Sequence, residues 1–268
     1  MDPIFFEAQS NSKLVDFISQ KLNISKNKAK EIIDQKRVFV NNKMIWISSF
    51  LLNPNDLVQI FPPKEIDFQV LYEDENFLVV SKGPNLTVDN DKNSLENILQ
   101  KKFNSYLKAV HRIDKDTTGV VVFAKNLKVF EEMKKNWNFV EKTYYCISIN
   151  PANFSVMEID KPVKGKPAIS TVILISKNSK LSLFKVKTYS GRKHQIRIHL
   201  NYIGFPILGD YLYGPKVQPL KVSRQMLHAY KIDFPFAGKR ITVKSTIPND
   251  MMEIITKNFK DLKKIFYD

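Results

Sequence analysis

Hydrophobic residues near the N-terminus recur with the period of an α-helix. The first set is spaced by three or four residues and comprises Leu14, Phe17, Ile18 and Leu22. Positions with this spacing share one face of a helix, so the pattern predicts a helix that buries them. A second helix is predicted to begin after Ser25, because serine side chains often cap a helix N-terminus. Its inward residues are Ala29, Ile32 and Ile33.

A strand, turn and strand should follow this helix pair. Residues 38–40 and 43–45 are short apolar or mixed runs separated by Asn41-Asn42. Asparagine tolerates the positive φ angles that a tight hairpin requires. Beyond them, Pro62-Pro63-Lys64-Glu65 interrupts regular structure and stiffens the chain. We therefore predict a boundary there, with a small domain at residues 1–62 and a larger one at residues 63–268.

The larger domain is predicted to have the α+β fold, built on a mixed, mainly antiparallel sheet with flanking helices. Short β-rich runs alternate with a few helical stretches, as in domains of that class. The predicted strands are residues 69–72, 77–80, 120–124, 143–149, 169–175 and 181–188.

Composition favours a polyanion as partner. The 268 residues include 42 Lys and Arg against 27 Asp and Glu, a formal net charge of +15 that attracts a phosphate backbone. A lysine- and asparagine-rich genome would produce the same bias, so charge alone does not decide. The single cysteine, Cys146, can form no internal disulfide, which fits a reducing compartment. Residues 1–8 lack a signal-peptide pattern and no apolar run is long enough to cross a membrane, so a cytoplasmic protein is expected.

Two stretches contain candidate chemistry. Residues 111–119, HRIDKDTTG, form a polar loop that leads into the apolar strand at 120–124. An aspartate in such a loop, Asp114, is more often a turn residue than a catalyst. Residues 190–200, SGRKHQIRIHL, predict a helix entered through Gly191, on which Ile196 and Leu200 share a buried face. The pattern does not determine where Arg197 points, and a solvated arginine is the alternative.

Residues 12–60 resemble a small RNA-binding domain, the αL motif, that is shared with a small-subunit ribosomal protein. Residues 69–248 resemble the RluA family of pseudouridine synthases, whose active-site motifs read H-R-L-D-x-x-T-S-G and G-R-x-H-Q-I-R-x-H. HRIDKDTTG and GRKHQIRIHL match them, and LYEDENFLVVSK, EKTYYCIS, GFPILGDYLYG and LHAYKIDFPF follow the same family order. One departure is Lys82-Gly83-Pro84-Asn85, where the family usually has Lys-Pro-x-Gly.

The resemblance implies an RNA-modifying isomerase that uses no cofactor or metal. Asp114 would be its catalytic residue, Arg197 the cationic partner of that carboxylate, and Tyr144 the ring against the target base. Arg112 would assist extrusion of that base from the RNA. The implied substrate-binding residues are Arg112, His111, Thr118, Arg192, His194 and Gln195. Large-subunit ribosomal RNA is the implied substrate, with transfer RNA as an alternative, and we expect a monomer.

The implied reaction suits these residue types. Isomerisation breaks the bond from uracil N1 to ribose C1′ and joins C5 to C1′, so positive character at the sugar favours a nearby carboxylate. Asp114 could attack C1′ or remove the C2′ proton, and the sequence leaves both roles open. A kinase-like loop is excluded because no Gly-rich loop or Asp-Phe-Gly is present. A zinc site is excluded because the four histidines lack ligand spacing. A non-catalytic RNA-binding protein remains the alternative.

Overall fold

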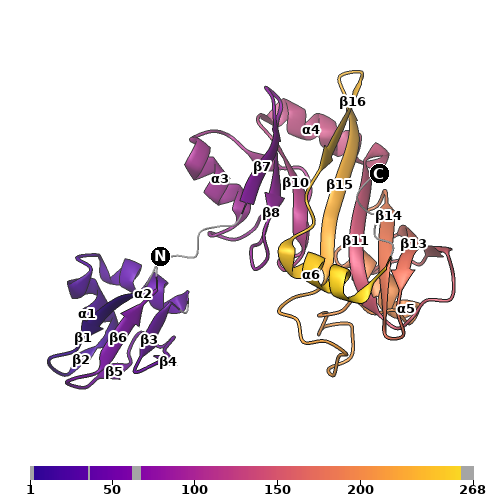
Figure 1. Cartoon of the computed structure of the whole chain (residues 1–268). Helices are drawn as coiled ribbons and strands as arrows, with labels where there is room; N and C mark the ends of the chain where they lie inside the picture. Colours follow the sequence, from indigo (N-terminus) through magenta and orange to yellow (C-terminus); the bar gives the residue numbers. More distant parts are fainter. Residues whose placement is uncertain (1–2, 36, 62–67, 261–268) are drawn as a thin grey trace. The chain divides into compact units, whose positions relative to one another are not determined.

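The computed structural model describes residues 3–35, 37–61 and 68–260 (Figure 1). The chain divides into two compact units, residues 1–66 and residues 67–268. The boundary predicted at Pro62-Pro63-Lys64-Glu65 lies at residues outside the described ranges.

The first unit packs two helices against a small sheet. Helices α1 (Leu14–Lys21) and α2 (Lys26–Asp34) are the two predicted from spacing. The Ser25 hydroxyl accepts a hydrogen bond from the Lys28 amide at 3.3 Å, which confirms the predicted cap. The hairpin is also confirmed, because Asn41 and Asn42 have φ angles of 50° and 64°. The sheet order is β1 (Ile4–Glu7), β6 (Leu57–Ile60), β3 (Val38–Val40) and β4 (Lys43–Met44), and β2 (Ser12–Lys13) pairs with β5 (Leu51–Leu52).

The second unit is built on one large sheet, and the predicted α+β class is confirmed. Its main path runs in the order β12 (Val156–Asp160), β13 (Ile169–Lys177), β14 (Leu181–Thr188), β11 (Glu141–Ile149), β15 (Leu227–Phe236), β10 (Thr118–Ala124), β8 (Phe77–Lys82) and β7 (Phe68–Glu73). Two strands lie off this path: β16 (Lys239–Lys244) pairs with β15, and β9 (Lys108–Ala109) pairs with β10. All six predicted strands are present, whereas β9, β12, β15 and β16 were not predicted from periodicity.

Helices cover both faces of this sheet, and alternation along the strands sorts the residues between them. On one face, α3 (Leu95–Phe103) packs on Val80 and Val121, and α5 (Gln195–Tyr202) packs on Cys146 and Val186. On the other face lie α4 (Leu127–Lys135), followed by a 3-10 turn (Trp137–Phe139), and α6 (Asn249–Asn258). None of the described helices is long and apolar enough to cross a bilayer.

The middle of the sheet contains a parallel pair of strands, β10 and β15. Gly119 of β10 faces Ala229 of β15 and has a φ angle of +113°. A Cβ atom at this position would lie 2.1 Å from the carbonyl oxygen of Ala229, so only glycine allows so close an approach. The loop before β10, which contains Asp114, is therefore anchored at the centre of the sheet.

Candidate active site

The loop at residues 111–117 is fixed at both ends by hydrogen bonds. At its start, the ring nitrogen Nε2 of His111 accepts from the Val122 amide at 3.1 Å. At its end, the Gln225 side-chain amide donates to the Thr117 hydroxyl at 2.6 Å. The Thr117 amide donates back to the Asp114 carbonyl at 3.1 Å, which closes a tight turn. These contacts hold the Asp114 side chain in one place on a rigid element.

The centre of the loop at residues 111–117 is hydrogen-bonded to residues 82–86, the segment that departs from the family pattern. The buried ammonium of Lys82 donates to the carbonyls of Lys115 at 2.9 Å and Gly83 at 2.7 Å. The Leu86 amide also donates to the Lys115 carbonyl, at 3.2 Å. The segment thus contacts the Asp114 loop even though Gly83-Pro84-Asn85 differs from the family pattern.

Helix α5 begins at Gln195, four residues after the predicted entry at Gly191. The preceding residue, His194, has a φ angle of 60° and so lies outside the helical region. The Gln195 side chain explains the late start, because its oxygen accepts from the Arg192 amide at 3.1 Å and from the Ser190 hydroxyl at 2.8 Å. These bonds stabilise a turn over residues 190–194 instead of a first helical turn. The prediction that Ile196 and Leu200 are buried is confirmed.

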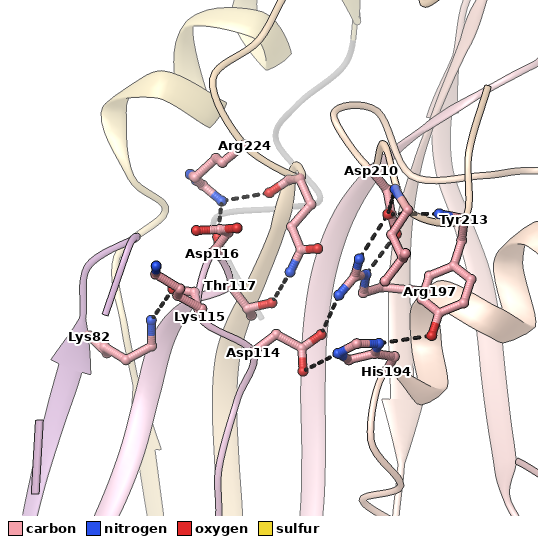
Figure 2. Close-up of polar contacts among 12 residues, drawn as sticks. Lys82, Asp114, Lys115, Asp116, Thr117, His194, Arg197, Asp210, Tyr213 and Arg224 are labelled. Carbon is pink, nitrogen blue, oxygen red and sulfur yellow. Dashed lines mark hydrogen bonds and ion pairs between the residues drawn. The ribbon is translucent and has the colours of Figure 1, made fainter. Parts of the chain in front are cut away.

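Arg197 of α5 lies between two carboxylates (Figure 2). Its Nη1 atom donates to Oδ2 of Asp114 at 3.0 Å, and its Nε and Nη2 atoms donate to the two oxygens of Asp210 at 2.7 and 2.8 Å. Burial acts to lower the pKa of Arg197, but the hydrogen bonds to Asp210 and Asp114 outweigh it and raise that pKa. Burial likewise acts to raise the pKa of Asp210, and Arg197 lowers it. The solvated-arginine alternative is wrong.

His194 lies on the other side of the Asp114 carboxylate. Its Nε2 atom is 3.7 Å from Oδ1 of Asp114, and its Nδ1 atom is 2.8 Å from the Tyr213 hydroxyl. Burial lowers the pKa of His194, which favours the neutral ring, while Asp114 acts against that shift. Tyr213 also packs against the guanidinium of Arg197, 5.1 Å from the ring centroid. The carboxylate thus has a permanent cation on one side and an imidazole on the other.

A cleft opens in front of these groups. It has two adjoining parts of about 60 and 200 Å³, which share Arg112, Asp114, His194 and Arg197. The half-buried Tyr144 of β11 lines the smaller part, and burial followed by the charge of Asp114 raises the pKa of its hydroxyl. That hydroxyl stays protonated at neutral pH. The cleft combines the carboxylates of Asp114 and Asp116, the Tyr144 ring and several cationic side chains.

Comparison with known proteins identifies the family. Residues 76–202 match the family model described as RNA pseudouridylate synthase, and residues 12–58 match the S4 domain model. An uncharacterized RNA pseudouridine synthase of Mycoplasma pneumoniae is 30% identical over 266 residues, which cover 85% of this chain and 86% of that protein. The chain belongs to the RNA pseudouridine synthases of the RluA family. It is therefore an isomerase.

Other similar proteins agree with this identification. The protein named ribosomal large subunit pseudouridine synthase D of Yersinia pestis is 28% identical over 290 residues, which cover 88% of this chain and 89% of that protein. The solved structure of human RNA pseudouridylate synthase domain containing 4 has a TM-score of 0.61 at 23% identity and covers 70% of this chain and 92% of that one. That likeness supports the fold of this synthase.

Most of the predicted site residues of the synthase meet in the cleft. The cleft-lining residues among them are Asp114, Arg197, Tyr144, Arg112, Arg192, His194 and Gln195. Arg112 is exposed and pairs with Asp89 at 3.1 Å. Gln195 lines the cleft, but its amide is engaged with neighbouring backbone and hydroxyl groups, so it positions the turn before α5.

The other two predicted substrate-binding residues lie elsewhere. His111 stacks on Trp137 with ring centroids 5.2 Å apart and lines neither part of the cleft. Thr118 is buried and its hydroxyl is 2.9 Å from Nδ1 of His228, away from the cleft. Neither side chain lines the described cleft, and each contacts neighbouring structural groups, the Val122 amide for His111 and the His228 ring for Thr118.

The sequence analysis missed Asp210, Tyr213 and Gln225. Asp210 and Tyr213 belong to the stretch GFPILGDYLYG, which supported the family resemblance without suggesting a role for any residue in it. An aspartate between glycine and tyrosine is typical of a turn. Asp210 does form a turn, since Oδ1 accepts from the amides of Leu212 and Tyr213, and the same carboxylate holds Arg197.

Proposed function

We propose that this synthase converts uridine to pseudouridine in large-subunit ribosomal RNA, with Asp114 as the catalytic residue. The observation that carries the proposal is the ion pair of 3.0 Å between Asp114 Oδ2 and Arg197 Nη1 at the floor of a cleft that Tyr144 lines. A carboxylate between Arg197 and His194, beside an aromatic ring, has the charge and shape that a flipped uridine requires.

The reaction assigns a part to each of these groups. The N1–C1′ bond breaks, the uracil turns over and a C5–C1′ bond forms. C5 then loses its proton and N1 gains one, so that the product is an isomer of uridine. Positive character at the ribose is stabilised by the Asp114 carboxylate, and Arg197 holds that carboxylate toward the cleft. The Tyr144 ring supports the base while it turns, because aromatic faces accept any base orientation.

The choice of ribosomal RNA rests on relatives and on domain content. The relative from Yersinia pestis is named for the ribosomal large subunit, and residues 12–58 match an S4 domain. Mapping pseudouridine in total RNA of a strain that lacks the gene tests this choice. Loss of a modification from large-subunit ribosomal RNA is expected, whereas loss confined to transfer RNA would contradict it.

The catalytic assignment is tested by Asp114→Asn, which keeps the size of the side chain and removes its charge. Single-turnover formation of pseudouridine on ribosomal RNA should fall by several orders of magnitude, as is common when an essential catalytic group is removed. RNA affinity should change little, because a carboxylate near phosphates does not attract them.

Asp116→Asn is the matched control, since it removes the same charge two residues along the loop. It should retain most of the activity, and circular dichroism should show both variants folded. Near-wild-type turnover by Asp114→Asn, or a greater loss in Asp116→Asn, would disprove the assignment.

A further inference from the structure

A second cavity lies next to the Asp114 loop, on the side away from the active-site cleft. It has a volume of about 400 Å³ and shares no lining residue with the cleft. Its walls include Lys82, Thr118, Arg224, His228, Asn249 and Asp250. In Figure 2, Lys82 and Arg224 lie across Asp114 from Arg197 and His194. Polar and charged side chains, several of them buried, therefore surround a space that the proposed reaction does not use.

Lys82 is a buried lysine in this wall, and the described residues supply no counter-ion for it. Its side chain is 1% exposed, and within the described part of the chain its ammonium contacts two neutral carbonyls and forms no ion pair. Burial lowers its pKa to about 7, with Asp116 and Asp114 acting against that shift from a distance. Buried charges are normally paired, because the cost of removing them from water is otherwise not offset. An anion in the cavity would provide the missing charge.

His228 presents an unsatisfied nitrogen in the same wall. The residue is 1% exposed, and its Nε2 atom has no hydrogen-bond partner among the described residues. Burial lowers the pKa of the ring to about 3, so the ring is neutral. Nδ1 is 2.9 Å from the Thr118 hydroxyl, and in the tautomer in which that hydroxyl donates, the ring hydrogen lies on Nε2. The Ser245 backbone acts to raise the pKa of the ring, but no described group meets the geometry of a hydrogen bond to Nε2. An acceptor atom is missing here.

The N-terminus of α6 contributes to the same cavity. Residues 246–250 line it, and the helix that starts at Asn249 has no side-chain cap. A helix N-terminus is electropositive and its free amides bind anions. The nearby carboxylate, Asp250, is paired with both Nε and Nη2 of Arg224 at 2.7 and 2.8 Å, so its charge is largely offset.

We propose that this cavity binds a phosphate group. Lys82, His228 and the first residues of α6 line one space, and among the described residues no carboxylate pairs with Lys82 and no acceptor meets Nε2 of His228. A phosphate oxygen is an acceptor suited to an ammonium, a ring N–H and helix amides. The group could belong to a nucleotide of the RNA, which rests on the proposed function, or to a free phosphate compound. Either ligand would contact Lys82, which supports the Lys115 carbonyl in the catalytic loop.

The site is tested with inorganic phosphate and the full chain. Calorimetric titration at constant ionic strength should give saturable binding with phosphate and none with chloride. Asn249→Asp adds a negative charge at the exposed first residue of α6, a position where acidic residues favour the helix, so the fold should be retained. It should weaken phosphate binding at least tenfold.

Two further variants make this result specific. Asn153→Asp adds the same charge at an exposed loop residue that lines none of these cavities and should leave binding unchanged. Arg192→Ala removes a cation from the active-site cleft and should also leave it unchanged. No saturable binding, binding unaffected by Asn249→Asp, or binding abolished only in Arg192→Ala would overturn the proposal. The titration measures phosphate binding and requires no turnover, so its result does not depend on whether the proposed function is correct.

The same variants separate the two sources of phosphate. If the group belongs to RNA, Asn249→Asp lowers RNA affinity, and inorganic phosphate competes with RNA for the wild-type protein. If it belongs to a free compound, RNA affinity is the same in both proteins and phosphate does not compete. Either result retains the site and identifies its source.

Discussion

Two carboxylates that are far apart in the sequence determine the direction of Arg197. The apolar residues Ile196 and Leu200 fix which face of α5 packs on the sheet, but they do not determine where a long side chain ends. Asp210 fixes that point through two parallel hydrogen bonds, and the remaining amino group is left for Asp114. Such fork-shaped pairing restricts a guanidinium more than a single contact does.

Asp210→Asn should therefore reduce both stability and turnover. The substitution leaves the buried Arg197 with one carboxylate instead of two, and removing one partner from a buried pair typically costs about 3–5 kcal/mol. Asp114 should also be displaced, so single-turnover rates should fall at least tenfold. Denaturant unfolding and rate measurements check the two effects.

Glu73→Gln provides the comparison for Asp210→Asn. It removes a carboxylate from the surface pair of Glu73 with Lys125, and exposed pairs contribute roughly 0–1 kcal/mol. This variant should behave as the wild type. If Asp210→Asn were equally mild, Asp210 would not be positioning Arg197.

Tyr144 should act through its ring more than through its hydroxyl in binding. Its raised pKa keeps the hydroxyl neutral, so Tyr144→Phe removes no charge and retains the stacking face. Tyr144→Ala removes that face, which contributes about 1–3 kcal/mol per base. Tyr144→Phe should thus hardly change RNA affinity and Tyr144→Ala should lower it markedly, which filter binding can measure. Equal affinity and turnover of both variants and the wild type would place Tyr144 outside the site.

At the scale of elements, the sequence predicted correctly those helices, turns and strands whose conformation depends on residues that are close together in the chain. The Ser25 cap, the Asn41-Asn42 turn and the helical spacing that begins at Leu14 involve only neighbours. The cap and the turn are confirmed, and so is the helix, except that Leu22 follows its last residue and is only partly buried. The six strands of alternating or continuous apolar residues were found for the same reason.

Elements that depend on distant partners were mispredicted or missed. The first turn expected from Gly191 is absent because the Gln195 side-chain amide donates to Ile169 and Ser170 of β13, which holds its oxygen where it accepts from residues 190 and 192. Strand β15 has the partly buried charged residues Lys231 and Asp233 among its apolar ones, and its pairing is interrupted by an irregularity opposite Thr143 and Tyr144. Among the site residues, Asp210 was missed because its pairing with Arg197 exists only in the folded chain and leaves no local pattern in the sequence.

The contact between β10 and β15 should be intolerant of any side chain at Gly119. Gly119→Ala would place a Cβ 2.1 Å from the Ala229 carbonyl oxygen and impose a φ of +113° on alanine. Gly238→Ala is the matched control, because its φ is +74° and nothing lies within 4 Å of the added atom. The control should cost about 1–2 kcal/mol of strain. Gly119→Ala should cost clearly more unfolding free energy and also lower activity, as unfolding curves and rate measurements would show. Equal losses of stability in the two variants would mean that β10 and β15 can move apart to make room for the added atom.

At the scale of the whole molecule, the two units differ in charge. Residues 1–66 contain nine Lys and Arg against seven Asp and Glu, whereas the rest of the chain contains 33 against 20. Most of the excess positive charge therefore belongs to the unit that contains the cleft. The S4 domain adds only a small net charge, so its contribution to RNA binding should come from a few well-placed contacts.

Removal of residues 1–62 should separate these contributions. The remaining residues have their own sheet and buried clusters, so the catalytic unit should stay folded, with an unchanged far-ultraviolet spectrum for its share of the chain. RNA affinity should fall, and the slope of log affinity against log salt should flatten by about 0.7–0.9 for each phosphate that the S4 domain neutralises in the intact protein. Because residues 1–66 include only nine basic residues, the change in slope should be small compared with the slope that remains. Turnover on saturating RNA should persist, since Asp114, Tyr144 and Arg197 all belong to the retained unit. An unchanged affinity and slope would show that the S4 domain does not contact the RNA, and loss of the folded spectrum would show that the two units are not independent.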